Sequence, residues 1–140
     1  MTAGDAAPTF HLQPIGVIRS TVTSRRDAAK QGNEGAPDVW LEIHSWASDG
    51  LLGMAVGDQI IVMTWLHQGR RDTLQVHPRG DARNPLTGVF ATRSPDRPNP
   101  LGLHPVEVRE IAGTRLRIGP MEVIDGTPVV DIKPVVPCAP

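Results

Sequence analysis

The stretch that decides the fold is Gly88-Val89-Phe90-Ala91-Thr92-Arg93-Ser94-Pro95-Asp96-Arg97-Pro98-Asn99-Pro100-Leu101-Gly102-Leu103. Its first residues are β-branched or aromatic and favour a strand that ends at Arg93. Beyond that point Pro95, Pro98 and Pro100 remove three backbone N–H donors and restrict the residues before them to extended conformations. Because neither a helix nor a central strand can continue through these prolines, we predict a stiff, irregular segment, here named the Pro-rich arm (residues 93–100).

The Pro-rich arm carries polar groups that suit a ligand. The guanidinium groups of Arg93 and Arg97 match carboxylate or phosphate, and the Asn99 amide both donates and accepts hydrogen bonds. Gly102 permits a sharp turn or a close approach to a ligand. The alternative is a surface loop in which Arg93 or Arg97 pairs with Asp96, and composition alone leaves both interpretations open.

The composition is that of one turn-rich β domain. A chain of 140 residues can bury a core without metal or disulfide support, and 14 Gly with 14 Pro indicate many turns. The single Cys138 excludes an intrachain disulfide, and the five histidines (His11, His44, His67, His77, His104) lack the pairing of a metal site. With neither a signal sequence nor a long apolar run, the protein is expected to be soluble and cytoplasmic, with no membrane partner.

Charge is unevenly distributed along the chain. The formal net charge is −1, but residues 70–97 contain six Arg against three Asp. This excess predicts a local basic face that could guide phosphates. A solvated surface with scattered ion pairs is the alternative, since neighbours in sequence need not form one patch.

Short extended segments separated by turns predict a mainly β protein, a small antiparallel β-barrel with one short helix and long loops. We expect strands at 13–20, 39–44, 59–66, 73–77, 103–111, 115–119, 121–124 and 128–133, and a helix at 45–52 capped by Ser45. The barrel domain is expected to span 13–136, after a disordered lead at 1–12 and before a tail at 137–140.

Alternation within these segments predicts which side chains face the core. Val39, Leu41 and Ile43 are expected to point inward, as are Leu116 and Ile118. Gly16 is expected to mark a bend or bulge, and Pro105 an edge or bulge.

Three motifs carry a resemblance to a known family. They are the stretch at 88–103, the run Asp125-Gly126-Thr127-Pro128-Val129-Val130-Asp131-Ile132-Lys133-Pro134, and the run Pro14-Ile15-Gly16-Val17-Ile18-Arg19-Ser20. The chain resembles the TsaA-like (YaeB, TrmO) family of S-adenosylmethionine-dependent methyltransferases from about Pro14 to Pro134. The resemblance implies a β-barrel that binds S-adenosyl-L-methionine, forms a homodimer, and N6-methylates threonylcarbamoyladenosine next to the tRNA anticodon.

The resemblance also assigns the walls of a methyl-donor pocket. It implies that Lys30 and Gln31 lie in a loop over the donor, that the Leu103 main chain meets the adenine, and that further walls are formed by Leu66, His67, Ile124, Asp125, Gly126 and Thr127. Arg93 is the candidate partner of the donor's carboxylate. Taken singly, Asp125-Gly126 would be an ordinary tight turn, His67 a structural histidine and Leu103 a core residue.

Catalysis needs mainly correct positioning, because the sulfonium already activates the methyl group. His67 and Asp131 are weak candidates for a base, and Asp131 could instead pair with Lys133. A tRNA adenosine modification is the favoured acceptor. The alternatives are a methyltransferase for a small molecule and a non-catalytic sensor, since His104-Pro105 departs from the common pattern and longer relatives carry a further domain.

Overall fold

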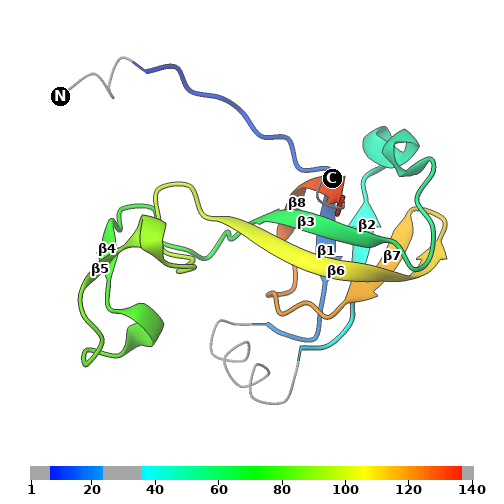
Figure 1. Cartoon of the computed structure of the whole chain (residues 1–140). Helices are drawn as coiled ribbons and strands as arrows, with labels where there is room; N and C mark the ends of the chain where they lie inside the picture. The colour runs from blue at the N-terminus through cyan, green and yellow to red at the C-terminus, as the bar shows by residue number, and fades with distance from the viewer. Residues whose placement is uncertain (1–6, 24–35, 137–140) are drawn as a thin grey trace.

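The computed structural model describes residues 7–23 and 36–136, in which six antiparallel strands close a barrel (Figure 1). The strand order is β1-β2-β7-β6-β3-β8, with β1 (Gly16–Arg19), β2 (Val39–Ile43), β3 (Gln59–Trp65), β6 (Leu101–Ala112), β7 (Arg115–Gly119) and β8 (Pro128–Pro134). A short 3-10 helix, η1 (Ser45–Leu51), follows β2. The predicted class, a mainly β antiparallel barrel with one short helix, is confirmed.

The interior of the barrel is filled by alternate side chains of each strand. As predicted, the inward side chains of β2 and β7 are almost fully buried, and those of β3 and β6 meet them in one core. The members are Ile18, Val39, Leu41, Ile43, Ile60, Val62, Val106, Val108, Leu116, Ile118, Met121, Val123 and Val129. Each such burial contributes about 1.5–3 kcal/mol before the cost in conformational entropy, so the barrel supports itself.

Between β3 and β6 the chain leaves the barrel as an excursion (residues 66–100), which extends to the left in Figure 1. It contains a two-stranded sheet of β4 (Gln75–Val76) and β5 (Thr87–Gly88), and two 3-10 turns, η2 (Pro78–Gly80) and η3 (Val89–Ala91). The strands expected at 73–77 and up to Thr92 are therefore much shorter than predicted.

The guanidinium of Arg97 explains why the strand before the Pro-rich arm ends early. It donates to the carbonyl oxygens of Val89, Thr92 and Ser94 at 2.9–3.1 Å. The Val89 carbonyl also accepts from the Thr92 N–H at 3.1 Å and the Thr92 hydroxyl at 3.0 Å. These carbonyls thus find their donors within residues 89–97 instead of in a neighbouring strand, and the backbone folds into the η3 turn.

Two glycines lie in regular strands, where a bend, bulge or sharp turn was one expectation. Gly16 lies in regular register between Ile43 and Val129, and a Cβ there would come within 2.5 Å of the Glu42 carbonyl oxygen. It is thus a point of close strand contact, not a bulge. Gly102 lies inside β6 opposite Thr64, so the sharp turn is wrong, and a close approach to a ligand stays a prediction.

Two segment predictions need correction, and one is confirmed in one of its two alternatives. Residues 121–124 form no strand, because Pro120 cannot donate to a ladder and Met121 N–H instead bonds the Pro37 carbonyl. Pro105 of β6 has a strand partner only on the β3 side, which agrees with the edge alternative, whereas the register irregularity lies further on, between Val108 and Glu110. The helix begins after His44 without a side-chain cap, so Ser45 does not cap it.

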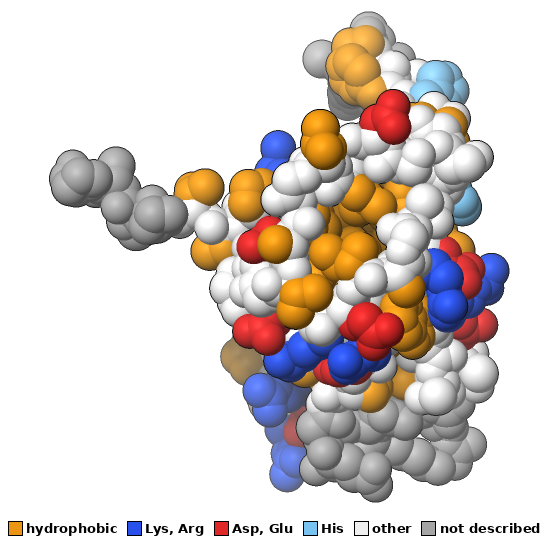
Figure 2. All heavy atoms as spheres, turned by 90° about the vertical axis from the view of Figure 1, so that its right-hand side faces the viewer, with side chains coloured by type: hydrophobic (Ala, Val, Ile, Leu, Met, Phe, Trp, Pro, Cys, Tyr) orange, Lys and Arg blue, Asp and Glu red, His pale blue; other side chains and the backbone are white. Residues whose placement is uncertain are grey.

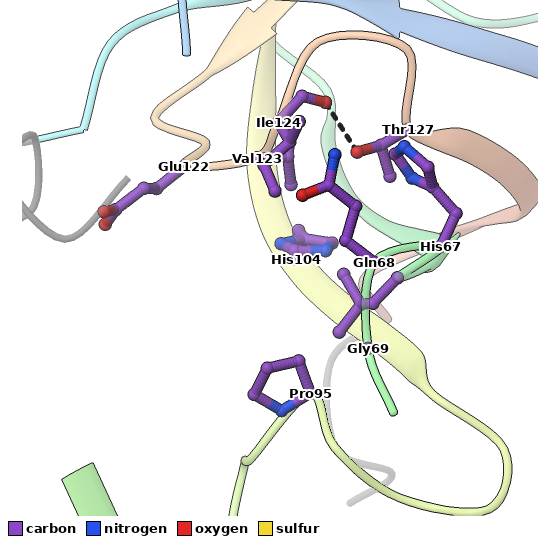
Figure 3. A pocket seen from close by; sticks show the side chains of 10 residues that line it. His67, Gln68, Gly69, Pro95, His104, Glu122, Val123, Ile124 and Thr127 are labelled. Carbon is purple, nitrogen blue, oxygen red and sulfur yellow. Dashed lines mark hydrogen bonds between the residues drawn. The ribbon is translucent and has the colours of Figure 1, made fainter. Parts of the chain in front are cut away.

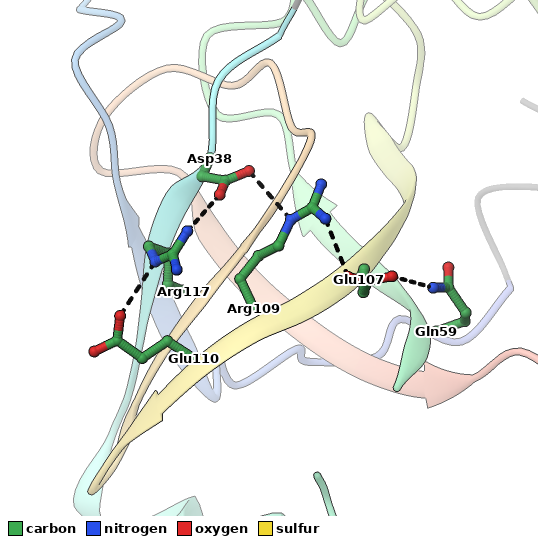
Figure 4. A network of polar contacts seen from close by, with 6 residues as sticks. All are labelled: Asp38, Gln59, Glu107, Arg109, Glu110 and Arg117. Atoms are coloured by element: carbon green, nitrogen blue, oxygen red, sulfur yellow. Dashed lines mark hydrogen bonds and ion pairs between the residues drawn. The ribbon is translucent and has the colours of Figure 1, made fainter. Parts of the chain in front are cut away.

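A network of ion pairs crosses the outside of the barrel between β2, β6 and β7 (Figure 4). Asp38 contacts Arg117 Nη1 at 2.6 Å and Arg109 Nε at 3.5 Å, and Arg109 continues to Glu107 at 3.0 Å. A side chain at Gly119 would overlap the Asp38 carboxylate, so this glycine makes the network possible.

The face that carries η1 has a different character. Figure 2 shows apolar side chains gathered in its middle above a band of charged ones. Trp46 and Leu52 of this region are 56% and 95% exposed. Among the described residues, no helix has the length and apolar character needed to cross a membrane.

Candidate methyl-donor pocket

A pocket of about 280 Å³ opens at the end of the barrel from which the excursion leaves. It is lined by the turn after β3, the segment before β8, one residue of β6 and one of the Pro-rich arm. Figure 3 shows His67, Gln68, Ile124 and Thr127 gathered on one side of His104, while the Glu122 side chain extends away from them. Segments that are far apart in the sequence thus form one cavity.

The turn after β3 is tied to the Pro-rich arm by the backbone. Leu66 N–H donates to the Pro100 carbonyl at 2.7 Å, and Arg97 N–H donates to the Arg70 carbonyl at 2.8 Å. Gly69 packs so tightly that a Cβ would overlap the Pro95 carbonyl oxygen. Pro95 is thereby held as a wall of the pocket.

The opposite wall is the turn at 124–127, which β1 holds in place. Gly126 adopts φ of 84° and donates its N–H to the Ile18 carbonyl at 2.8 Å. Asp125 accepts a hydrogen bond from Ser20 N–H at 2.9 Å, and the Thr127 hydroxyl donates to the Ile124 carbonyl. Asp125 therefore uses one carboxylate oxygen to fix the turn.

His104 lies on the inward row of β6, two residues before Val106. Its Nε2 is 2.9 Å from the hydroxyl of Thr64, which is completely buried. A Cβ at Gly102 would come within 2.5 Å of the Thr64 hydroxyl and 2.6 Å of His104 Nε2, so this pair depends on glycine at 102.

Burial, and secondarily the positive charge of Arg93, lowers the pKa of His104 to about 4. The imidazole is consequently neutral at pH 7. Among the described residues, the lining contains no lysine or arginine and one carboxylate, that of Glu122. The pocket therefore suits a ligand that carries positive charge.

The structure brings together four of the predicted site residues, since Leu66, His67, Ile124 and Thr127 all line this pocket. Asp125 and Gly126 belong to the same turn but are not part of the lining. Leu103 lies opposite Met63 in the β3–β6 ladder, with its side chain 49% exposed.

Other predicted residues lie elsewhere. Arg93 lines a second cleft, on the excursion, although its charge reaches His104. Asp131 lines a pocket with Trp46 and Leu51, and its carboxylate is 3.8 Å from Lys133 Nζ, the alternative expected from the sequence. Asp131 and His67 thus do not share a pocket. Lys30 and Gln31 lie outside the described residues.

Sequence reasoning missed His104, Gln68, Gly69 and Glu122. A signal for His104 was present, because the alternation that places Val106 and Val108 inward also places residue 104 inward. Its partner Thr64 could have been found in the same way on the neighbouring strand.

Comparison with known proteins identifies the family. The family model described as the tRNA-methyltransferase O N-terminal domain matches residues 17–139. The chain belongs to this family. The resemblance seen in the motifs is thus confirmed.

Two curated relatives of this family are similar to the chain over most of their own length. One is a "Probable S-adenosyl-L-methionine-binding protein" of Methanothermobacter thermautotrophicus, 41% identical over 125 residues that cover 89% of each chain. Another is an S-adenosyl-L-methionine-binding protein of Archaeoglobus fulgidus, 40% identical over 122 residues, which cover 87% of this chain and 86% of the relative.

Solved structures of TrmO proteins have a fold similar to that of this chain. The crystal structure of TrmO from Pseudomonas aeruginosa matches with a TM-score of 0.68 and 29% identity, covering 93% of this chain and 57% of that one. A second TrmO crystal structure matches with a TM-score of 0.69 and 30% identity, covering 94% and 57%. The chain thus spans a little over half the length of the TrmO chains it matches.

Proposed function

We propose that the pocket around His104, here named the barrel-mouth pocket, binds S-adenosyl-L-methionine. We further propose that the protein transfers the donor's methyl group to an adenosine modification of tRNA. The observation that carries this proposal is the shared pocket: the turn at 66–69, Pro95 and the turn at 124–127 converge there. The family, and the names of relatives such as that of Methanothermobacter, support the same donor.

The charge of the lining fits this donor. S-adenosyl-L-methionine carries a sulfonium and an ammonium, and a cation in a pocket is destabilised by a positive neighbour. The neutral His104 and the absence of lysine or arginine from the described lining avoid that penalty. The donor supplies an activated methyl group, so the protein's task is to orient donor and acceptor.

The predicted contacts divide among the walls. Ile124 and the buried Thr127 form the pocket wall opposite Pro95. The Leu103 main chain remains the predicted partner of the adenine. Arg93 remains the predicted partner of the carboxylate, from the far side of Pro95, and Lys30 and Gln31 remain predicted to cover the donor. His67, exposed in the pocket lining, is the stronger candidate for proton acceptor, because Asp131 lies in another pocket.

The favoured acceptor is N6 of threonylcarbamoyladenosine next to the anticodon. The test is incubation of the purified chain with isotopically labelled donor and tRNA that carries the unmethylated nucleoside, followed by nucleoside mass spectrometry. Appearance of the N6-methylated nucleoside supports the proposal. Donor binding without any change of the nucleoside would remove this acceptor.

Two alternatives follow from the comparisons. The relatives' names describe binding of the donor, and the chain spans only part of TrmO. A methyltransferase for a small molecule would give turnover with a metabolite extract but not with tRNA. A non-catalytic sensor would bind the donor tightly and give no methylated product with either.

We also propose a homodimer in the cytoplasm. Leu101 and Leu103 on the outer row of β6 are 46% and 49% exposed. Leu12, which lines a cleft together with Leu101, is 55% exposed. Apolar side chains on one sheet face are a common feature of interfaces between copies. Light scattering after gel filtration would reveal a mass of two chains, and a single-chain mass would refute the dimer.

A further inference from the structure

A second cleft, of about 600 Å³, lies on the excursion between η2 and the start of the Pro-rich arm. His77, Arg79, Thr92 and Arg93 are among the residues that line it. Pro95 lines both this cleft and the barrel-mouth pocket. The two cavities therefore share Pro95 as a wall residue.

Four of the six arginines in residues 70–97 already make hydrogen bonds or ion pairs within the protein. Arg70 pairs with Asp72 at 3.2 Å and Arg83 pairs with Asp81 at 2.8 Å. Arg97 donates hydrogen bonds to three backbone carbonyls. Arg71 donates to the Pro98 carbonyl, and its guanidinium carbon lies 5.1 Å from the Trp65 ring centroid. Arg79 and Arg93 have no hydrogen bond or ion pair to any residue that the structure describes. Both line the cleft.

The backbone holds Arg79 in an unfavourable conformation. Its φ of 62° makes it the only non-glycine residue with positive φ in the described ranges 7–23 and 36–136. Such a residue costs about 1 kcal/mol or more. Asn84 stabilises the turn, because its Nδ2 donates to the Pro78 carbonyl at 2.7 Å and its carbonyl accepts from His77 Nδ1 at 2.8 Å.

One carboxylate also faces the cleft, that of Asp96. Its Oδ1 accepts a hydrogen bond from Arg70 N–H at 2.9 Å, which partly satisfies its charge. Two guanidinium groups against one carboxylate leave the cleft positive. Arginine binds phosphate through two parallel hydrogen bonds, so an anion with several oxygens is the matching ligand.

We propose that this cleft binds a phosphate group of the methyl acceptor, with Arg79 as the direct contact and the positive charge of Arg93 beside it. The proposal rests on the proposed function, because it takes the neighbouring pocket as the donor site. The phosphate could belong to an RNA backbone or to a small phosphorylated molecule. In either case it would anchor the acceptor beside Pro95, next to the pocket where the methyl group is presented.

The test compares Arg79→Asn with Arg83→Asn in the full chain. Asparagine tolerates left-handed backbone, so Arg79→Asn is expected to fold. Arg83 is a matched control, an exposed arginine of the same loop that is already paired with Asp81. The probes are a single-stranded RNA oligonucleotide, followed by fluorescence anisotropy at several salt concentrations, and inorganic phosphate, followed by calorimetry.

We expect Arg79→Asn to weaken RNA binding about fivefold or more and to lower the salt slope by about 0.7, the value for one phosphate contact. Arg83→Asn should stay within about twofold of the unsubstituted protein. If the unsubstituted protein binds phosphate but not RNA, and Arg79→Asn abolishes this, the acceptor is a small phosphorylated molecule. Equal effects of the two substitutions, or no binding of either probe, would overturn the proposal.

Donor affinity is measured in parallel and separates this proposal from the proposed function. Arg79→Asn should leave the affinity for S-adenosyl-L-methionine unchanged, since Arg79 does not line the donor pocket. Absence of donor binding in every variant would refute the donor pocket while leaving the phosphate measurement valid.

Discussion

Replacing His104 by glutamine should remove a specific part of the protein's sensitivity to acid. Burial and Arg93 lower the pKa of His104 from 6.5 to about 4 on folding. Between these values the unfolded chain takes up a proton that the folded chain does not. Lowering the pH therefore favours the unfolded state, and the folded protein loses stability as the pH falls from about 6.5 to about 4.

The size of the effect follows from the two pKa values. The full shift corresponds to about 3 kcal/mol, and the part lost between about pH 7 and about pH 5 is about 2 kcal/mol. Other groups also titrate in this range, so the quantity to compare is the difference between the unsubstituted protein and His104→Gln at each pH. That difference should change by about 2 kcal/mol in favour of the variant on acidification.

Urea unfolding followed by tryptophan fluorescence at a series of pH values measures this difference. The slopes with urea must agree between the two proteins, so that the free energies of unfolding can be compared. Arg93→Ala is a useful control, because burial is the larger cause and most of the acid loss should persist without Arg93. Parallel pH curves for the unsubstituted protein and His104→Gln would show that the histidine is solvated in the folded state, and would refute the reasoning.

Three further substitutions test other parts of the structure. Arg93→Ala should weaken donor binding by about 2–4 kcal/mol if Arg93 pairs with the carboxylate, and calorimetry showing no change would assign it to the acceptor cleft alone. Gly102→Ala should lower stability by about 1–3 kcal/mol in thermal unfolding, because its Cβ disrupts the Thr64–His104 pair; an unchanged melting temperature would contradict the contact. Asp38→Ala should cost about 1 kcal/mol, since its partners are only partly buried, and Arg117→Ala in the same background should then cost less than it does alone; additive losses would show that the two are independent.

The barrel was predictable because its strands obey simple alternation. In β2 and β7 each second residue is apolar and buried, so the sequence alone identified Leu41 and Leu116 as core residues. The excursion was less predictable. Its backbone is organised by the Arg97 guanidinium, two of whose three carbonyl partners, Val89 and Thr92, lie in a segment that has the composition of a strand.

The candidate site was predicted in part for a similar reason. A turn such as residues 124–127 can be recognised from its own sequence, here the Asp125-Gly126 pair. The direction of a side chain in a Pro-rich segment cannot, because such a segment has no regular alternation. Arg93 was consequently expected in the donor pocket and lies in the neighbouring cleft. His104 was not assigned to the site, because its hydrogen-bond partner Thr64 is distant in the sequence.

Titration of the isotope-labelled protein with S-adenosyl-L-methionine, followed by amide NMR, tests the central claim most directly. We predict saturable shifts concentrated at residues 66–69, at His104, at residues 122–124 and at Thr127, which line the barrel-mouth pocket. The absence of shifts, or shifts concentrated around Trp46 and Leu51 in the other pocket, would contradict it.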